Sequence, residues 1–256
     1  MKEIIVIKVG SSTLTNGTDR ISRGKLEELA DQIVQLQKEY HVVLVSSGAI
    51  ATAKQYLQTE DWKDLLASKQ AMAAIGQPKL MQFYYEVFSD FKLQIAQCLL
   101  TYRDFDSEIA KTNTLNTIKE LLKHNFVPIV NENDTVAVEE IELGDNDKLS
   151  AKVATLINAK LLILVSDIDG VYDKNPHLYN DATLIKEVND LEMVQQFIDE
   201  RKDGIGTGGM TSKLEAARIC KANGVMTIIT KGTNSRFLTG AIDGSIPRTI
   251  FSINKY

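Results

Sequence analysis

A lysine followed by a glycine and two serines stands close to the start of the chain. Lys8 interrupts an apolar run that is typical of a buried strand, and Gly10, Ser11 and Ser12 come directly after it. Burying an ammonium group is costly unless it faces an anion. A glycine allows close backbone approach, and the following N–H groups can bind phosphate oxygens. The pattern predicts either a phosphate site or an edge-strand lysine that reaches solvent before a turn.

A second segment, Ser46-Ser47-Gly48, follows another apolar run and precedes a helical pattern. A helix N-terminus at the carboxyl end of a strand suits a carboxylate or a phosphate. The same residues also suit an ordinary strand-to-helix turn, so the motif alone leaves both interpretations open.

A glycine-rich segment, residues 204–213, reads GIGTGGMTSK. It contains the spacing G-x-G-x-x-G, but a charged stretch precedes it where a dinucleotide-binding motif requires a strand. Lys213 also lies too far from Gly209 for a Walker A loop. We interpret the segment as a flexible glycine loop whose hydroxyls and lysine close over a polyphosphate, in preference to a disordered surface loop.

Carboxylates and amides are concentrated in residues 131–134 (NEND) and 144–147 (GDND). Acidic loops are usually just solvated. Here, however, Asn131 and Asp134 come directly after a buried strand, and Asp147 opens a helical segment. Aspartate and asparagine together suit the α-ammonium and carboxylate groups of one small molecule. Further along, Asp167 follows another strand, where it could accept hydrogen bonds from a nucleotide or orient a lysine.

The three histidines, His41, His124 and His177, are scattered along the chain. Their separation supports neither a zinc triad nor a Ser-His-Asp arrangement, and we expect His41 at the surface, at the end of the first helical hairpin. Cys98 and Cys220 form no paired metal motif or disulfide framework, so we expect two reduced thiols and no bound structural metal.

Short β-branched runs that are continuously apolar alternate with helical patterns, which predicts parallel strands covered on both faces. We therefore expect an α/β fold, a three-layer α-β-α sandwich with a mainly parallel open sheet, in which ligands bind beyond the carboxyl ends of the strands. Ser22 is the expected cap of the first long helix, and Gly224 the expected end of the last. The expected strands are Ile4–Val9, Val42–Ser46, Leu93–Leu100, Val127–Val130, Leu161–Ser166 and Val225–Thr230. The expected helices are Leu26–Val34, Asp64–Phe88 with an interruption near Pro78, Thr112–Lys123, Lys148–Asn158, Leu191–Glu200 and Lys213–Ala222.

The amino-acid composition limits the classes of protein to which this sequence can belong. The 256 residues include 34 acidic and 29 basic side chains, a formal charge of −5, with 44% hydrophobic and 25% charged residues. These values are typical of a globular protein and exclude collagen and disordered chains. A pI near 5.4 argues against a general nucleic-acid binder. No apolar stretch reaches the roughly 20 residues of a membrane helix, so we expect a cytoplasmic protein.

Six segments, in order along the chain, resemble the amino-acid kinase family, and within it the branch that phosphorylates glutamate in the first step of proline biosynthesis. The resemblance implies transfer of phosphate from ATP, with Mg²⁺ held mainly by the nucleotide, to the glutamate side-chain carboxylate. It also implies feedback inhibition by proline and a homo-oligomer, a dimer or a tetramer. Many members carry an additional C-terminal domain of an RNA-binding type that this sequence lacks, and we expect no nucleic-acid partner. The segments are Ile7–Ser12, Val45–Ile50, Asn131–Asp134, Gly144–Ala151, Ser166–Asp167 and Gly206–Met210.

The resemblance assigns roles to individual residues. Lys8 and Lys213 are implied to bind phosphate, with Asp147 orienting them as the third catalytic residue. A serine precedes Lys213 where the family more often has threonine, and its hydroxyl can serve equally. One domain is expected, with a substrate lobe over 1–158 and a nucleotide lobe over 159–256. The implied glutamate contacts are Ser47, Gly48, Asp134 and Asn146. The implied ATP contacts are Lys8, Ser166, Asp167, Thr207, Gly208, Gly209, Met210, Thr211, Ser212 and Lys213.

Three alternatives remain at this stage. A sibling kinase would act on N-acetylglutamate, aspartate, carbamate or UMP. A nicotinamide oxidoreductase is suggested only by the glycine spacing. A non-catalytic amino-acid sensor would bind glutamate or proline without turnover, although both lysines and Asp147 speak against it.

Overall fold

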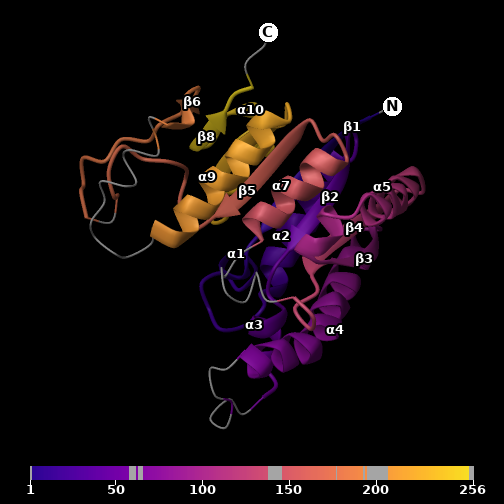
Figure 1. Cartoon of the computed structure of the whole chain (residues 1–256). Coiled ribbons are helices and arrows are strands. Elements are labelled where there is room, and N and C mark those ends of the chain that lie inside the picture. The colour runs from indigo at the N-terminus through magenta and orange to yellow at the C-terminus, as the bar shows by residue number, and fades with distance from the viewer. Residues whose placement is uncertain are drawn as a thin grey trace.

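The computed structural model describes residues 2–57, 62, 66–137, 146–176, 178–192, 194 and 207–253 (Figure 1). Within these ranges the strands are β1 (Glu3–Val9), β2 (Tyr40–Ser46), β3 (Gln94–Leu100), β4 (Phe126–Glu132), β5 (Leu161–Ser166), β6 (Glu187–Val188), β7 (Met226–Lys231) and β8 (Arg248–Phe251). The helices are α1 (Ser11–Leu14), α2 (Arg23–Leu36), α3 (Ala49–Lys54), α4 (Leu66–Asp90), the 3₁₀ helix η2 (Tyr102–Phe105), α5 (Glu108–Lys123), α7 (Asp147–Leu156), α9 (Thr207–Ala222) and α10 (Thr239–Asp243).

The described strands form one sheet in the order β3-β4-β2-β1-β5-β7-β8-β6. The six strands from β3 to β7 pair in parallel, and β8 runs antiparallel to β7. The carboxyl ends of β4, β2, β1, β5 and β7 therefore meet at one edge of the sheet. This arrangement confirms the predicted mainly parallel α/β sandwich.

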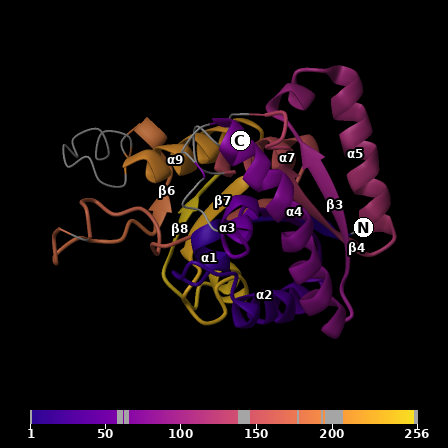
Figure 2. The ribbon, with the colours of Figure 1, turned by 90° about the horizontal axis from the view of Figure 1, so that it is seen from below.

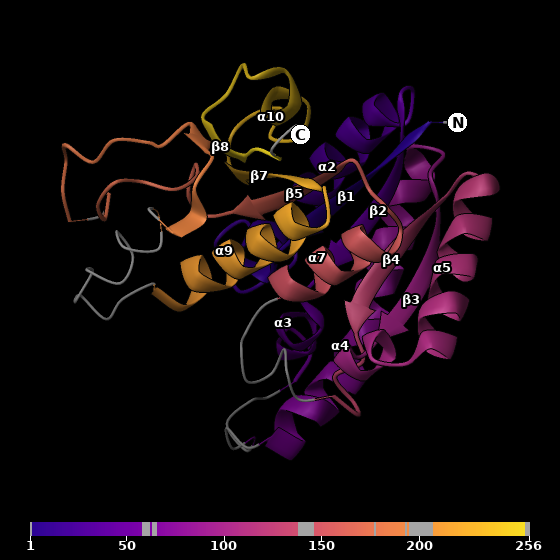
Figure 3. The same cartoon turned by 45° about the horizontal axis from the view of Figure 1, so that its top comes forward.

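Helices cover both faces of the sheet. Buried side chains of α2, α4 and α10 pack on one face, and those of α5, α7 and α9 pack on the other. Figure 2 separates α2 from α7 and α9, and Figure 3 shows α7 and α9 side by side. Because side chains alternate along a strand, Ile7 and Val9 of β1 face α2 and α4, whereas Val6 faces α7 and α9. The same alternation turns Lys8 toward α7 and α9.

Two expectations about α4 and α9 were wrong. Helix α4 is continuous through Pro78, which lies inside it. Proline removes the hydrogen bond to the carbonyl four residues earlier, but Ala74 and Pro78 both lie on the exposed side of the helix, where water can satisfy that carbonyl. Helix α9 begins at Thr207 rather than at Lys213, so the glycine-rich segment enters the helix from Thr207 onward.

The edges of the sheet also differ from expectation. Strand β3 was expected to be buried, but as an edge strand it buries only Leu100 fully. The short strands β6 and β8 were not predicted, because their few residues carry little periodicity. The predicted helix over 191–200 lies mostly outside the described residues.

Local capping agrees with what the sequence predicts. The Ser22 hydroxyl accepts a hydrogen bond from the N–H of Lys25 at the start of α2, as predicted. Gly224 lies two residues after the end of α9 and has a left-handed φ of +72°, a conformation that is common where helices end. Cys98 and Cys220 are both free thiols. No helix in the described part of the chain is long and apolar enough to cross a membrane.

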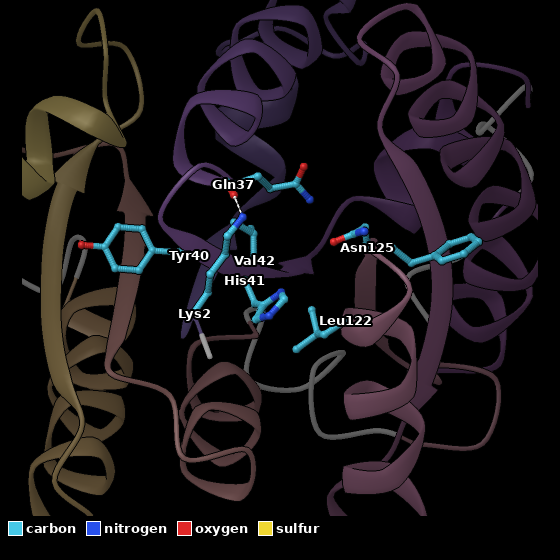
Figure 4. Close-up of a pocket in the computed structure, with 8 residues that line it drawn as sticks. Lys2, Gln37, Tyr40, His41, Val42, Leu122 and Asn125 are labelled. Atoms are coloured by element: carbon cyan, nitrogen blue, oxygen red, sulfur yellow. Dashed lines mark hydrogen bonds between the residues drawn. The ribbon is translucent and has the colours of Figure 1, made fainter.

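At the amino ends of β2 and β4 the structure has a small cavity of about 200 Å³ (Figure 4). His41 is partly exposed but lies within β2 rather than at the end of a helical hairpin as expected, and burial together with Lys2 lowers the pKa of its imidazole. Lys2 Nζ donates to the carbonyl of Gln37, 2.6 Å away. This cavity lies at the opposite end of the strands from the residues singled out in the sequence.

Candidate active site

Three charged side chains from distant parts of the chain meet at the carboxyl edge of the sheet. Lys8 Nζ lies 2.7 Å from Asp147 Oδ1, and Lys213 Nζ lies 2.9 Å from Asp147 Oδ2. Lys8 comes from the central strand, Asp147 is the first residue of α7, and Lys213 is in α9. The carboxylate thus bridges two ammonium groups that would otherwise repel each other.

The bridge is buried, so its charges interact strongly. Asp147 is 0% exposed, Lys8 3% and Lys213 9%. Burial alone would raise the pKa of Asp147, but the charges and hydrogen bonds of Lys8 and Lys213 outweigh it and lower that pKa. The carboxylate is therefore ionised at neutral pH. The trio keeps a net charge of +1, which suits a ligand that is an anion.

Next to this trio lies a network of buried amides and hydroxyls. Asn146, directly before α7, donates from Nδ2 to the carbonyl of Ser46 (3.0 Å), Ser47 Oγ (3.3 Å) and Asn131 Oδ1 (2.7 Å). Gly48 then adopts φ +111° as the residue before α3, a conformation that favours glycine. The network joins Ser47 and Asn146, and Gly48 follows Ser47 directly, so three of the four predicted glutamate contacts lie close together.

Asp134, the fourth of these residues, lies in the turn that follows β4 and is 6% exposed. Burial raises the pKa of its carboxyl to about 6. A buried carboxylate with a raised pKa is poised to accept a cationic partner, because a nearby ammonium group would restore its charged form.

The predicted nucleotide residues lie on the other side of β1. Val165 of β5 pairs with Val9, so Ser166, the last residue of β5, lies beside Gly10, and Asp167 follows the strand. Ser166 Oγ donates to Asp167 Oδ1 at 3.0 Å. The Ser166 carbonyl accepts from the N–H of Gly232, which follows β7.

The start of α9 reaches beyond the two lysines. Lys213 is the seventh residue of α9, so the helix begins about 9 Å further on at 1.5 Å per residue. Gly209 and Thr211 are exposed in these first turns, Ser212 is half-buried, and Met210 is buried in the core against α7. Of Thr207 and Gly208 only the backbone is described. Gly144, Asp145, Gly204 and Gly206 lie outside the described residues.

A cavity of about 580 Å³ adjoins the same edge of the sheet, between the turn after β1 and helix α3. Hydroxyl groups and one lysine line most of it. The lining residues are Ser11, Ser12, Thr15, Gly17, Thr18, Asp19, Ala51 and Lys54.

Sequence reasoning missed the contribution of α4 to this site. Gln77 Oε1 accepts from Asn131 Nδ2 at 2.9 Å, and the Tyr84 hydroxyl lies 2.8 Å from Ser46 Oγ. The signal in the sequence was the spacing: Gln77 and Tyr84 are seven residues apart, which places them on one helix face with the buried Leu80 between them. A glutamine on an otherwise buried helix face requires a polar partner.

Residues 3–231 match the Amino acid kinase family, which is most of the chain. The chain belongs to the amino acid kinase family. Relatives include glutamate 5-kinase 2 of Bacillus licheniformis, 43% identical over 98% of this chain and 68% of the relative, and glutamate 5-kinase of Clostridium acetobutylicum, 42% identical over 96% and 93%.

Solved structures of the same fold include carbamate kinase from Giardia lamblia bound to AMP-PNP, with a TM-score of 0.70, and UMP kinase from Ureaplasma parvum, with a TM-score of 0.64. The identities are 16% and 17%, and the matches cover 98% of this chain and 99% of each structure. At these identities the likeness concerns the fold alone.

Proposed function

We propose that this protein transfers the terminal phosphoryl group of ATP to the side-chain carboxylate of L-glutamate, giving L-glutamyl 5-phosphate and ADP, the first step of proline biosynthesis. The observation that carries the proposal is the Lys8–Asp147–Lys213 bridge beside the Asn146 network. Relatives named glutamate 5-kinase, more than 40% identical over nearly the whole chain, support the same activity.

The chemistry explains why the site, in the part of the chain that the structure describes, gathers cations and no histidine. A glutamate side chain has an ordinary pKa of about 4.3, so at pH 7 it is already an anionic nucleophile and needs no general base. The obstacle is the repulsion between that carboxylate and the triphosphate. Positive groups that stabilise charge on the transferring phosphoryl group remove this obstacle. Lys8 and Lys213 supply two such groups from opposite sides of Asp147.

The residues present fit a magnesium-nucleotide complex. Two buried ammonium groups with one carboxylate leave an uncompensated positive charge at the edge of the sheet, which a polyphosphate would neutralise. In the described residues, no group of three or more His, Cys, Asp or Glu side chains could hold a metal ion. We infer that Mg²⁺ comes with the nucleotide phosphates and supplies further charge neutralisation there.

In this proposal residues 1–158 hold glutamate, and residues 159–256 together with Lys8 hold ATP. Ser47, Gly48, Asp134 and Asn146 bind glutamate within residues 1–158. Lys8 and Lys213 bind phosphate oxygens, and Asp147 keeps both ammonium groups directed at the transferring group. Over 159–256, the ATP contacts are Ser166, Asp167 and the start of α9, Thr207–Lys213.

The direct test incubates the protein with ATP, glutamate and hydroxylamine. Glutamyl phosphate is an acyl phosphate, so hydroxylamine should trap it as γ-glutamyl hydroxamate, with ADP released in equal amount. Hydroxamate formation separates a kinase from an amino-acid sensor, which would bind without turnover. Absence of NAD(H) binding by titration would close the oxidoreductase alternative.

Substrate choice separates glutamate from the sibling substrates. A site built to bind an ammonium group should reject N-acetylglutamate by about 10⁴-fold in kcat/KM, because the amide leaves a buried carboxylate without its partner. Equal kcat/KM values for glutamate and N-acetylglutamate would contradict the assignment. The proposal also includes inhibition by proline, which glutamate should relieve. It further includes a homo-oligomer, which light scattering would detect.

A further inference from the structure

Helix α4 reaches the substrate site through a chain of three buried side-chain amides. Gln77 on α4 accepts from Asn131 Nδ2 at the end of β4, and Asn131 Oδ1 accepts from Asn146 Nδ2 before α7. The exposed fractions of the three residues are 9%, 1% and 0%. This row of amides therefore links α4, on one face of the sheet, to the residue directly before α7, on the other face.

Hydrogen bonds to backbone groups, together with the Gln77 acceptor, determine which way each asparagine amide points. The N–H of Glu132 can only donate, and it donates to Asn131 Oδ1 at 2.9 Å. Asn131 Nδ2 must then find an acceptor, which Gln77 Oε1 provides. The carbonyl of Ser46 can only accept, and it accepts from Asn146 Nδ2. Rotating either asparagine by half a turn would place donor against donor or acceptor against acceptor.

At one end of this row of amides, an acceptor has no hydrogen-bond donor. Asn146 Oδ1 is buried, and no group in the described part of the chain donates a hydrogen bond to it. A buried acceptor that has no donor costs free energy, and buried polar groups normally have a hydrogen-bond partner. The amide directions therefore leave a single acceptor, held in a defined place, for a donor that a ligand would bring.

We propose that Gln77 is a positioning residue for amino-acid specificity: through Asn131 it holds Asn146 so that Oδ1 accepts a hydrogen bond from the α-ammonium group of the substrate. The inference rests on the proposed function, since it concerns how the glutamate site selects its ligand. Gln77 acts through two other side chains and contributes no group to the reaction itself.

The test compares glutamate with glutarate, which has the same two carboxylates but no amino group. Gln77→Met nearly preserves side-chain volume and removes the strong acceptor. We expect the ratio of kcat/KM for glutamate to that for glutarate to fall about 10-fold, the scale of one misplaced hydrogen bond to a charged group. The fall should come from a higher KM for glutamate, with kcat and the glutarate parameters nearly unchanged.

Two further variants make the result specific. Gln82→Met makes the same change on the same helix, where Gln82 is exposed and donates to Glu86 Oε1, and it should keep the wild-type ratio. Gln77→Glu keeps an acceptor for Asn131 Nδ2 and should also keep the ratio. Melting curves verify that each variant folds.

The outcomes separate the two proposals. If the wild type forms no γ-glutamyl hydroxamate, the proposed function fails. If the wild type prefers glutamate and Gln77→Met keeps that preference, or loses activity on both substrates equally, the role of Gln77 is overturned. If Gln77→Met does not fold, Gln77→Glu decides: a wild-type ratio supports the role, and a loss of selectivity overturns it.

Discussion

Asp147 is placed to act on charges rather than on protons. Its two oxygens each contact a different lysine, and the lysines lower its pKa in spite of its burial. A carboxylate in this state stays ionised over the whole physiological range. Its contribution to catalysis would be to hold two ammonium groups where the transferring phosphoryl group needs them.

Asp147→Asn keeps the shape of the side chain and removes its charge. We expect kcat to fall by about 10²–10³-fold, the effect of losing one preorganised electrostatic group. The KM for glutamate should change little, because the loss is felt mainly in the transition state. Asp31→Asn, on the exposed side of α2, is the control. An unchanged kcat with a raised KM would make Asp147 a substrate ligand instead.

Asp134 should impose a pH dependence on glutamate binding. Its pKa of about 6 means that the carboxyl is largely protonated at pH 5 and ionised at pH 7. Only the ionised form attracts the ammonium group, so kcat/KM for glutamate should rise with pH through about 6. A pH–rate profile of Asp134→Asn should lack this limb and show a much lower kcat/KM. Persistence of the limb in the variant would assign it to another group.

At the scale of elements, α4 supports the substrate site by close packing as well as by hydrogen bonds. A Cβ atom added at Gly76 would lie 1.8 Å from the carbonyl oxygen of Ala49 and 2.8 Å from the N of Ala53. Both belong to α3, so only glycine allows the two helices to approach this closely. Because Gly48 and Ser47 immediately precede α3, the packing at Gly76 also sets the position of the substrate residues.

Gly76→Ala should therefore push α3 away and lower the free energy of unfolding by about 1–3 kcal/mol, as overpacking usually does. Gly24→Ala is the matched control, since a Cβ atom there meets nothing within 4 Å and the residue lies in α2. That change should raise stability by about 0.5–1 kcal/mol through helix propensity. Chemical denaturation measures both. The packing argument would be contradicted if the two variants unfolded alike.

At the scale of the whole molecule, the buried Asp134 carboxyl of the substrate site lowers the stability of the folded protein at neutral pH. The folded-state pKa of Asp134 is raised from 3.8 to about 6, so between these pH values the folded protein binds more protons than the unfolded chain. The free energy of unfolding must then fall as the pH rises through this window. Asp147 has the opposite sign, because its lowered pKa gives stability above pH 4 that is lost in acid.

Asp134→Asn should therefore be more stable than the wild type at neutral pH and much less active. The expected gain is about 3 kcal/mol at pH 7, from roughly 1.4 kcal/mol per pKa unit. The difference should shrink toward pH 4, where the wild-type carboxyl is also uncharged. Unfolding curves at pH 4, 5.5 and 7 provide the measurement. A stability difference that does not vary with pH would show that Asp134 ionises without penalty.

The sequence by itself determined the class of fold, the carboxyl ends of β1, β2 and β5, and the family. Continuously apolar runs such as Leu161–Ser166 identify buried parallel strands, because both faces of such a sheet are covered. The motifs around Lys8, Asp147 and Lys213 identify the chemistry, since ammonium groups in apolar surroundings require anions. These are local properties, and they can be inferred from neighbouring residues.

Only the tertiary structure decided which side chains meet. Lys213 and Asp147 are 66 residues apart, and Gln77 and Asn131 are 54 apart. Alternation along a strand turns Lys8 toward one face and Asn131 toward the other, but the order of the strands and the packing of α4, α7 and α9 decide what each one finds there. Such contacts depend on the packing of the whole core, which no local pattern encodes.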